Sequence, residues 1–141
     1  MDAVKVGLLA VIPSMSVTTL LIGNDETVFD IHISPASGKA IIDAISKEKL
    51  TRPSTHTLLS NITATLGYQI SSVIIHSTKD SVFFAKILMS NISNEGKYIE
   101  LDCRPSDAIT LSIINDAPLL VAEELFNLVG KPKSNTLLQK I

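Results

Sequence analysis

The sequence predicts an α+β domain built on a largely antiparallel, mixed β-sheet with helices packed on it. Short runs rich in β-branched residues come in two groups of three, and turn sequences such as GNDE and TKDS divide the runs. Segments with helical spacing follow each group. Strands joined by short turns pair antiparallel. The expected order, β-β-β-α-α-β-β-β-α-β-α, is therefore not a series of βαβ units.

The first half of the chain should hold three strands and two helices. The strands are expected over Val4–Ile12, Val17–Ile22 and Thr27–Ile33. The segment SPASGKAIIDAISKE then changes to helical spacing. A second helix follows KLTRPSTH and is expected to stop at Gly67. Its apolar stripe consists of Leu58, Leu59, Ile62 and Leu66.

The second half should hold four strands and two helices. The strands are expected over Gln69–Ser77, Val82–Met89, Tyr98–Cys103 and Leu119–Val121. One helix is expected over Pro105–Ile114, and AEELFNLV predicts a last short helix that stops at Gly130 and Pro132. Residues 1–130 should form a single domain, followed by a weakly ordered tail over residues 131–141.

Composition limits the classes of function. The 141 residues include 12 Lys and Arg against 14 Asp and Glu, a formal charge of -2, so any polyanion site must be local. No apolar run approaches the roughly 20 residues that span a bilayer, so no membrane association is expected. Cys103 is the only cysteine of the chain, which fits a reducing compartment. These features predict a cytoplasmic protein.

Two helix starts share the letters Arg-Pro-Ser, in RPSTHTLLSNI and RPSDAITLSII. Proline favours the first helical position, which makes Arg104 the expected N-cap and Asp107 the third helical residue. One interpretation is structural: Asp107 accepts hydrogen bonds from free backbone N–H groups. The other is functional, because arginines beside helix N-termini form phosphate sites. If the two starts lie close together, Arg52 and Arg104 form a clamp for phosphate, and Asp107 holds a metal or orients a water.

Three histidines have different prospects. His56 should lie in the first turn of its helix, where it is a candidate general base or metal ligand, with an exposed structural histidine as the alternative. His32 and His76 lie in β-like runs without a helical partner and are expected to be structural. The chain has no P-loop, G-x-S-x-G or zinc motif, and its low aromatic content, 4%, argues against a base-stacking platform.

The stretches TRPSTHTLLSNITATLG, SSVIIHSTKDSVFFAKILM and YIELDCRPSDAITLSIINDAPLLVAEEL resemble the bifunctional nuclease domain family. The uninterrupted match RPSDAI is the most specific part. The resemblance implies an α+β domain that forms homo-oligomers and cuts DNA and RNA. By motif match it carries over a first set of residues, Arg52, Pro53, Thr55 and His56. The second set is Arg104, Ser106 and Asp107.

Together with the resemblance, the residue types suggest an enzyme in which His56 and Asp107 are catalytic, Arg52, Arg104 and Ser106 bind phosphate, and Asp107 holds a divalent metal, Mg²⁺ or Mn²⁺. Two departures from the family pattern weaken the case for a bound metal. The chain has Thr57 and Lys39 where the family stretches usually have acids, and metal-assisted hydrolysis needs carboxylate oxygens. Three hypotheses remain open: a metal-assisted nuclease, a non-catalytic oligomeric module that binds an anion or ligand, and an oligomeric interaction domain in which the Arg-Pro-Ser residues are structural caps.

Overall fold

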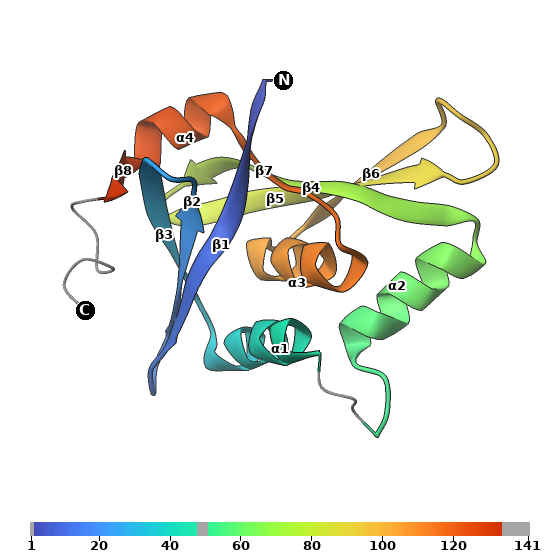
Figure 1. Ribbon diagram of the computed structural model, residues 1–141, viewed down its shortest axis with the longest axis horizontal. Helices are drawn as coiled ribbons and strands as arrows, with labels where there is room; N and C mark the ends of the chain where they lie inside the picture. The colour runs from blue at the N-terminus through green and yellow to red at the C-terminus, as the bar shows by residue number, and fades with distance from the viewer. Residues whose placement is uncertain (1, 48–50, 134–141) are drawn as a thin grey trace.

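The computed structural model describes residues 2–47 and 51–133 (Figure 1). The first half contains β1 (Ala3–Pro13), β2 (Thr18–Gly23), β3 (Thr27–Ile33), α1 (Pro35–Ser46) and α2 (Thr55–Thr65). The second half contains β4 (Tyr68–Lys79), β5 (Val82–Asn91), β6 (Tyr98–Cys103), α3 (Pro105–Asn115), β7 (Leu119–Ala122) and α4 (Glu123–Val129). The α+β class and the expected element order are confirmed.

A further strand, β8 (Lys131–Pro132), follows α4 and pairs with β3. The backbone N–H of Lys133 also donates to the carbonyl of Glu26, at 2.9 Å. The start of the expected tail therefore adds to the edge of the sheet, because its backbone groups find partners there. Residues 134–141 of that tail lie outside the described residues.

The strands form one eight-stranded mixed sheet in the order β6-β5-β4-β7-β1-β2-β3-β8. Its pairs are antiparallel except that of β4 with β7, which is parallel. The short strand β7 joins the two groups of three strands, because it pairs with β1 on one side and β4 on the other. The sheet also curls, so that Phe29 of β3 stacks on Phe83 of β5 with ring centroids 5.8 Å apart.

Helix α3 is the central helix of the fold. Its buried residues are Ser106, Ala108, Ile109, Thr110, Leu111 and Ser112. Figure 1 shows α1 and α2 beside α3 on the same side of the sheet. Helix α1 approaches β2 closely, since a Cβ atom on Gly38 would collide with the buried side chain of Thr18. This packing fixes the start of α1 near the start of α3.

The two Arg-Pro-Ser segments do not start their helices in the same way. In α3, Arg104 is the N-cap and Pro105 the first helical residue, as expected. In α2 the N-cap is Ser54, whose Oγ accepts from the backbone N–H of Thr57 at 3.1 Å. The serine hydroxyl satisfies a free N–H group of the first turn, so α2 begins two residues later than a proline start predicts.

Within the described residues, no helix is long and apolar enough to cross a membrane.

Candidate functional site

Three helices begin around one hollow of about 710 Å³, which we call the helix-start hollow. Its polar rim includes Ser34 and Ser37 at the start of α1, Thr55 and His56 at the start of α2, and Arg104 and Asp107 at the start of α3; Thr63 and the carboxylate of Asp102 also line it. Its apolar floor includes Ile70, Ile87, Met89 and Leu101 from the sheet. The partial positive charge of the helix N-termini and the guanidinium of Arg104 favour an anion here, whereas the carboxylate of Asp102 opposes one.

His56 and Asp107 form the link between two of these helix starts. The His56 Nε2 atom lies 2.9 Å from Asp107 Oδ1, although 51 residues separate them in the sequence. Their side chains are only 17% and 21% exposed. His56 is in the first turn of α2 and Asp107 is the third residue of α3, as expected. The structure therefore brings the two expected catalytic residues together.

Arg104 holds the same carboxylate from the other side. Its Nε donates to Asp107 Oδ2 at 2.8 Å and its Nη2 donates to Asp107 Oδ1 at 2.9 Å. Such a bidentate pair fixes both groups in a plane. The Arg104 side chain is nevertheless 70% exposed, so its remaining N–H groups face solvent. Among the described residues, Asp107 accepts hydrogen bonds from the side chains of Arg104 and His56, which take the place of the expected backbone N–H donors.

The pKa of Asp107 reports the balance of these contacts. Burial alone would raise it, but the hydrogen bonds from Arg104 and His56, together with their charges, outweigh burial and lower the pKa below its ordinary value. Asp107 is therefore a carboxylate at neutral pH. A carboxylate beside a histidine orients the imidazole and stabilises its protonated form.

The neighbouring thiol is not activated. Cys103 lines the helix-start hollow, is half-buried and is a free thiol. Burial, followed by the negative charges of Asp107 and Asp102, raises its pKa to about 11. Since the thiolate is the nucleophilic form, Cys103 is unreactive at neutral pH.

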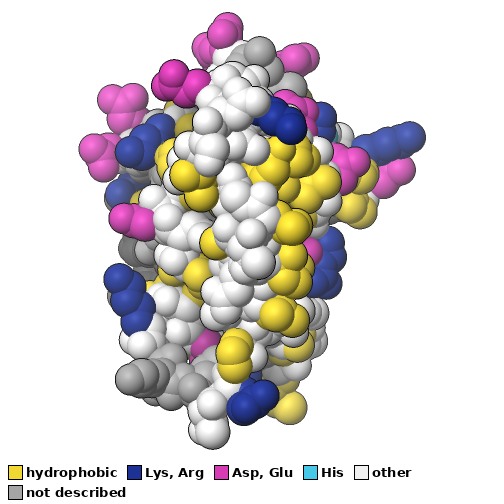
Figure 2. Space-filling model, turned by 90° about the vertical axis from the view of Figure 1, so that its right-hand side faces the viewer, with side chains coloured by type: hydrophobic (Ala, Val, Ile, Leu, Met, Phe, Trp, Pro, Cys, Tyr) yellow, Lys and Arg dark blue, Asp and Glu magenta, His cyan; other side chains and the backbone are white. Residues whose placement is uncertain are grey.

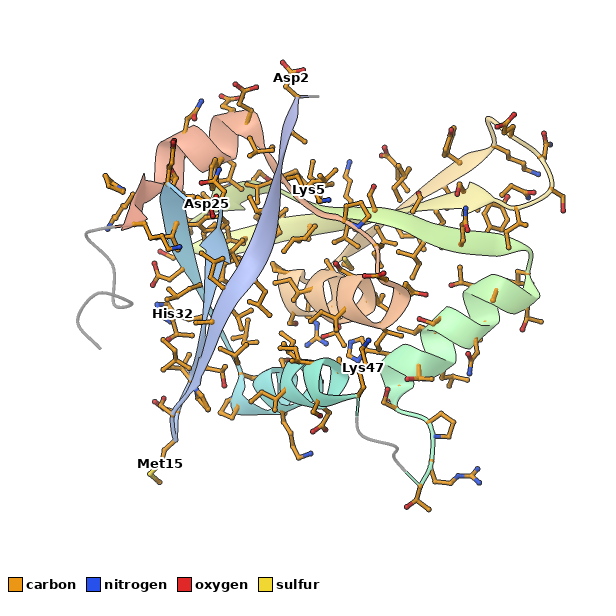
Figure 3. The ribbon with its side chains drawn as sticks, viewed as in Figure 1. Asp2, Lys5, Met15, Asp25, His32 and Lys47 are labelled. Atoms are coloured by element: carbon orange, nitrogen blue, oxygen red, sulfur yellow. The ribbon has the colours of Figure 1, made fainter. Side chains whose placement is uncertain are left out.

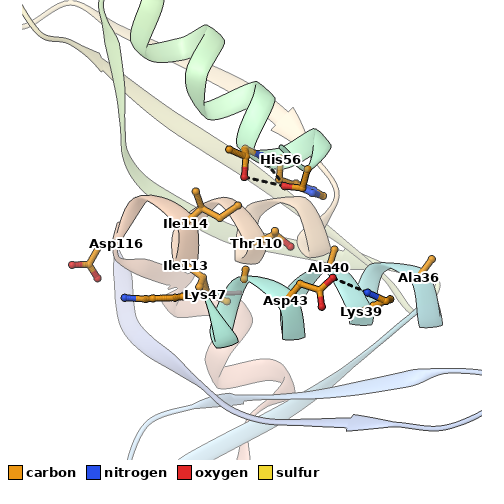
Figure 4. A pocket seen from close by; sticks show the side chains of 13 residues that line it. Ala36, Lys39, Ala40, Asp43, Lys47, His56, Thr110, Ile113, Ile114 and Asp116 are labelled. Atoms are coloured by element: carbon orange, nitrogen blue, oxygen red, sulfur yellow. Dashed lines mark hydrogen bonds and ion pairs between the residues drawn. The ribbon is translucent and has the colours of Figure 1, made fainter. Parts of the chain in front are cut away.

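A second hollow of about 600 Å³, here the helix groove, lies between α1 and α2 over α3 (Figure 4). It is lined by Lys39, Asp43, Lys47, His56 and Thr57, among others. His56 thus borders both hollows. Lys39 Nζ lies 2.9 Å from Asp43 Oδ2, and the Thr57 hydroxyl accepts from Ser54 at 3.0 Å. The two positions that usually carry family acids therefore face one groove, and neither is acidic here.

A divalent metal at Asp107 requires several oxygen ligands. Across residues 2–47 and 51–133, no three His, Cys, Asp or Glu side chains gather in a group able to hold a metal ion. Both oxygens of Asp107 already accept hydrogen bonds from Arg104 and His56. The described residues around Asp107 therefore offer too few free oxygen ligands to fit Mg²⁺ or Mn²⁺. The expected metal stays a prediction.

The other expected phosphate ligands lie apart from the His56–Asp107 pair. Arg52 is exposed in the bend before α2 and does not line the helix-start hollow or the helix groove. Ser106 is buried in the first turn of α3, and it lines a third hollow of about 1060 Å³ that it shares with Arg104. Arg104 is thus the expected phosphate ligand that directly contacts the pair.

Sequence reasoning missed the contribution of α1. Ser34 caps this helix by accepting from the backbone N–H of Ser37 at 3.2 Å, and both serines line the helix-start hollow. The signal was present, because Ser34-Pro35 is a common helix start. Only the packing of α1 against β2 shows that this start joins the other two.

An α+β domain with a partly buried histidine, a carboxylate and an exposed arginine beside an open hollow has the groups of an acid–base site for an anionic substrate. The sequence profile of the bifunctional nuclease domain matches residues 19–134, and the chain belongs to that family. The matched region contains the complete His56–Asp107–Arg104 cluster.

Several named proteins are similar to the chain. Bifunctional nuclease 1 of Arabidopsis thaliana is 24% identical over 85 residues, which cover 60% of this chain and 26% of the relative. Bifunctional nuclease 2 of Oryza sativa subsp. japonica is 21% identical over 113 residues, 80% of this chain and 35% of the relative. A Mycobacterium tuberculosis protein is 24% identical over 107 residues, which cover 76% of this chain and 62% of the relative. The matched segment is thus about a quarter to a third of the length of these plant relatives.

Proposed function

We propose that this domain hydrolyses phosphodiester bonds in DNA and RNA, with His56 as the general base. The observation that carries the proposal is the 2.9 Å contact between His56 Nε2 and Asp107 Oδ1. The family supports the substrate class, since its relatives are named bifunctional nucleases.

The contact defines which nitrogen of His56 can act as a base. When Nε2 carries the proton it donates to the Asp107 carboxylate, and the lone pair of Nδ1 is free to accept a proton. In the proposed reaction, Nδ1 takes a proton from the attacking water while the new P–O bond forms. The bond from phosphorus to the leaving oxygen breaks, and that oxygen takes a proton from solvent. Asp107 stabilises the imidazolium that results.

Arg104 supplies the positive charge for the phosphate. Two of its nitrogen atoms are fixed by Asp107, so the guanidinium keeps one orientation, and its exposed edge offers further N–H donors. A phosphate held there lies beside three helix N-termini. Arginine contacts that strengthen as charge builds on the phosphoryl oxygens lower the barrier to transfer.

A second function is favoured by the helix groove. Lys39 and Thr57 stand there in place of family acids, which makes the groove poorer in metal-binding oxygens and richer in positive charge. This supports a non-catalytic module in which the same cluster binds a phosphorylated ligand.

A cleavage assay separates the two functions. Purified protein is incubated with single-stranded DNA and with RNA, in Mg²⁺, in Mn²⁺ and in EDTA, beside the Asp107→Asn variant. The nuclease proposal expects products that Asp107→Asn reduces by about 100-fold, because the variant loses the orienting charge of the dyad. Equal cleavage by both proteins would assign the products to a contaminant. No cleavage, with phosphate binding that Arg104→Gln removes, would establish the binding module.

A further inference from the structure

The third hollow, of about 1060 Å³, lies between two strand edges of the curled sheet, and we call it the strand-edge hollow. Residues 82–84 of β5 line one side of it and residues 30–33 of β3 line another. In the described part of the chain, β6 pairs with β5 only from Ala85 onward, and β8 pairs with β3 only at Thr27 and Val28. Both strand edges therefore lack a strand partner at this hollow, and the sheet is open there.

The strand-edge hollow adjoins the helix-start hollow. Five residues line both of them: Ser34, Ser37, Asp102, Cys103 and Arg104. His56 and Asp107 line the helix-start hollow but not the strand-edge hollow. A phosphate that Arg104 holds within reach of His56 therefore leaves its own sugar and base close to the strand-edge hollow.

Phe84 is the exposed aromatic residue that lines this hollow. Its neighbour Phe83 stacks on Phe29 and packs against the core. Because successive side chains of a strand point to opposite faces, Phe84 and Val82 share the other face, where they are 43% and 55% exposed. An aromatic ring at the edge of a hollow is a surface on which a nucleobase can stack, since every base has a flat π-face.

A tight turn fixes the strand that carries Phe84. The two residues between β4 and β5, Asp80 and Ser81, have φ angles of 52° and 66°. Lys79 and Val82, on either side of them, are paired. Two successive positive φ angles between paired residues define a type I′ hairpin turn, in which a serine is strained. The two-residue connection leaves the start of β5 little freedom, so the Phe84 ring keeps its position in the wall of the hollow.

The charges around the strand-edge hollow balance. Its charged lining residues are two cations and two carboxylates: Arg104, Lys131, Asp30 and Asp102. A hollow without excess positive charge does not favour a second phosphate. Its open space and apolar walls suit the uncharged base of a nucleotide, while the phosphate stays at Arg104.

No long basic track for nucleic acid runs over the described part of the face in Figure 2. The side chains of this face, at the right-hand end of the domain in Figure 1, are mainly uncharged or hydrophobic. Lys and Arg lie toward its margins together with Asp and Glu. Proteins that hold long strands follow the backbone with a positively charged groove. Contact with a strand is therefore expected to be local, at one phosphate and one base.

We propose that the strand-edge hollow binds one unpaired nucleobase, stacked on Phe84, of the nucleotide whose phosphate Arg104 holds. The inference rests on the proposed function, because that function places the phosphate at Arg104. A base inside a duplex is stacked and paired, so it cannot reach a protein ring without leaving the helix. The domain therefore prefers single strands.

One stacked base is compatible with both proposed substrates and with the few aromatic residues of the chain. Stacking uses the flat face that all bases share and does not read the 2′-hydroxyl of the sugar, so one hollow serves DNA and RNA. The aromatic content of 4% argues against a platform for successive bases. A single base needs a single ring.

Binding of short single strands tests the inference without relying on cleavage. The dissociation constant of the wild-type chain is measured for a fluorescein-labelled oligothymidine and for a strand of the same length in which every nucleotide is abasic. Gels confirm that both strands stay intact during the measurement. We expect the strand with bases to bind about 10-fold more tightly, as one stacked base implies. The oligothymidine annealed to its complement should bind as weakly as the abasic strand.

Variants of Phe84 separate stacking from apolar contact. Phe84→Leu keeps an apolar side chain without a π-face, and it should reduce the 10-fold preference to about twofold or less. Phe84→Tyr keeps the ring and should retain the preference. Tyr98→Leu is the matched control, because Tyr98 is an aromatic residue of β6 that is 59% exposed and lines none of the three hollows. It should bind like the wild type, and thermal unfolding verifies that each variant is folded.

Three results would overturn the inference: equal affinity of the wild type for the two single strands, no binding of either strand, or a preference that Phe84→Leu leaves unchanged. A peptide of alternating Val and Thr that binds in place of the strands would also overturn it, and would assign the free edges to an extended protein segment. A protein that cleaves strands without this preference keeps the nuclease proposal and loses the base site. A protein that shows the preference without cleavage keeps the base site and loses the nuclease proposal.

Discussion

Among residues 2–47 and 51–133, two histidine–aspartate pairs have similar contact distances but differ in burial and in the elements they join. His56 Nε2 and Asp107 Oδ1 are 2.9 Å apart, and His32 Nε2 and Asp30 Oδ2 are 3.1 Å apart. The first pair joins two helices and is about four-fifths buried. In the second pair the two residues are two positions apart on β3, and the His32 and Asp30 side chains are 58% and 51% exposed. In Figure 3, His32 is on the other side of α3 from α2.

The difference teaches that contact distance does not define a functional site. Water surrounds His32 and Asp30 and screens their interaction. In the first pair, Arg104 holds the carboxylate, packing limits the motion of the imidazole, and an open hollow lies beside it. His32 instead makes its other contact with the hydroxyl of Thr19, at 3.1 Å across β2 and β3. Asp30 and His32 also border a hollow, the third one of about 1060 Å³, so what sets the His56 pair apart is its burial and the arginine that holds its carboxylate.

The largest expected effect is on cleavage. His56→Ala should reduce the rate of phosphodiester cleavage by about 100-fold or more, because the general base is lost. His32→Ala should stay within about twofold of the wild type, since an exposed surface pair contributes little. Rates on a labelled oligonucleotide measure both. Equal losses in the two variants would show that the buried pair has no special role.

The next effect is on stability. Asp107→Asn should lower the free energy of unfolding by about 1–3 kcal/mol, because charged hydrogen bonds to Arg104 and His56 are lost in a partly buried place. Asp30→Asn should change it by less than about 0.5 kcal/mol. Urea unfolding at neutral pH compares the variants. A larger loss in Asp30→Asn would reverse the ranking of the two pairs.

Acid should weaken the buried pair in a defined direction. Although burial opposes it, the contacts with Arg104 and His56 lower the pKa of Asp107. The stability from this group is therefore fully present above the ordinary Asp pKa of about 3.9 and is lost as the pH falls through the lower, folded-state pKa. Urea unfolding below about pH 4 should show a steeper pH slope for the wild type than for Asp107→Asn. Identical slopes would mean that the pKa of Asp107 is the same folded and unfolded.

The smallest expected effect comes from Thr57, beside the buried pair. Thr57 is the third residue of α2, the position that Asp107 occupies in α3. Thr57→Asp should raise the free energy of unfolding by about 0.5 kcal/mol, because a carboxylate there complements the helix N-terminus. Thermal unfolding at low salt measures it, with Thr65→Asp, at the helix end, expected to destabilise. A decrease for Thr57→Asp would indicate repulsion from Asp107.

Much of the fold could be predicted because local patterns are strong. Alternating β-branched runs, turn sequences and the proline start of α3 all act within a few residues, and the structure has the elements they predict. The start of α2 was misplaced because the Ser54 cap, which competes with a proline start, depends on one side-chain hydrogen bond. The outward orientation of the apolar stripe of α2 could not be predicted either. Periodicity shows that a helix has an apolar face but not where that face points.

The candidate site, like the fold, could be predicted only in part. His56, Arg104 and Asp107 could be selected from the sequence, because helix starts are local and their residue types suit phosphate chemistry. The sequence by itself determined the elements, the charge of the chain and the presence of these groups near helix ends. Only the tertiary structure decided that His56 reaches Asp107, that Arg104 joins them and that Arg52 does not, because contacts across 51 residues depend on how α2 and α3 pack.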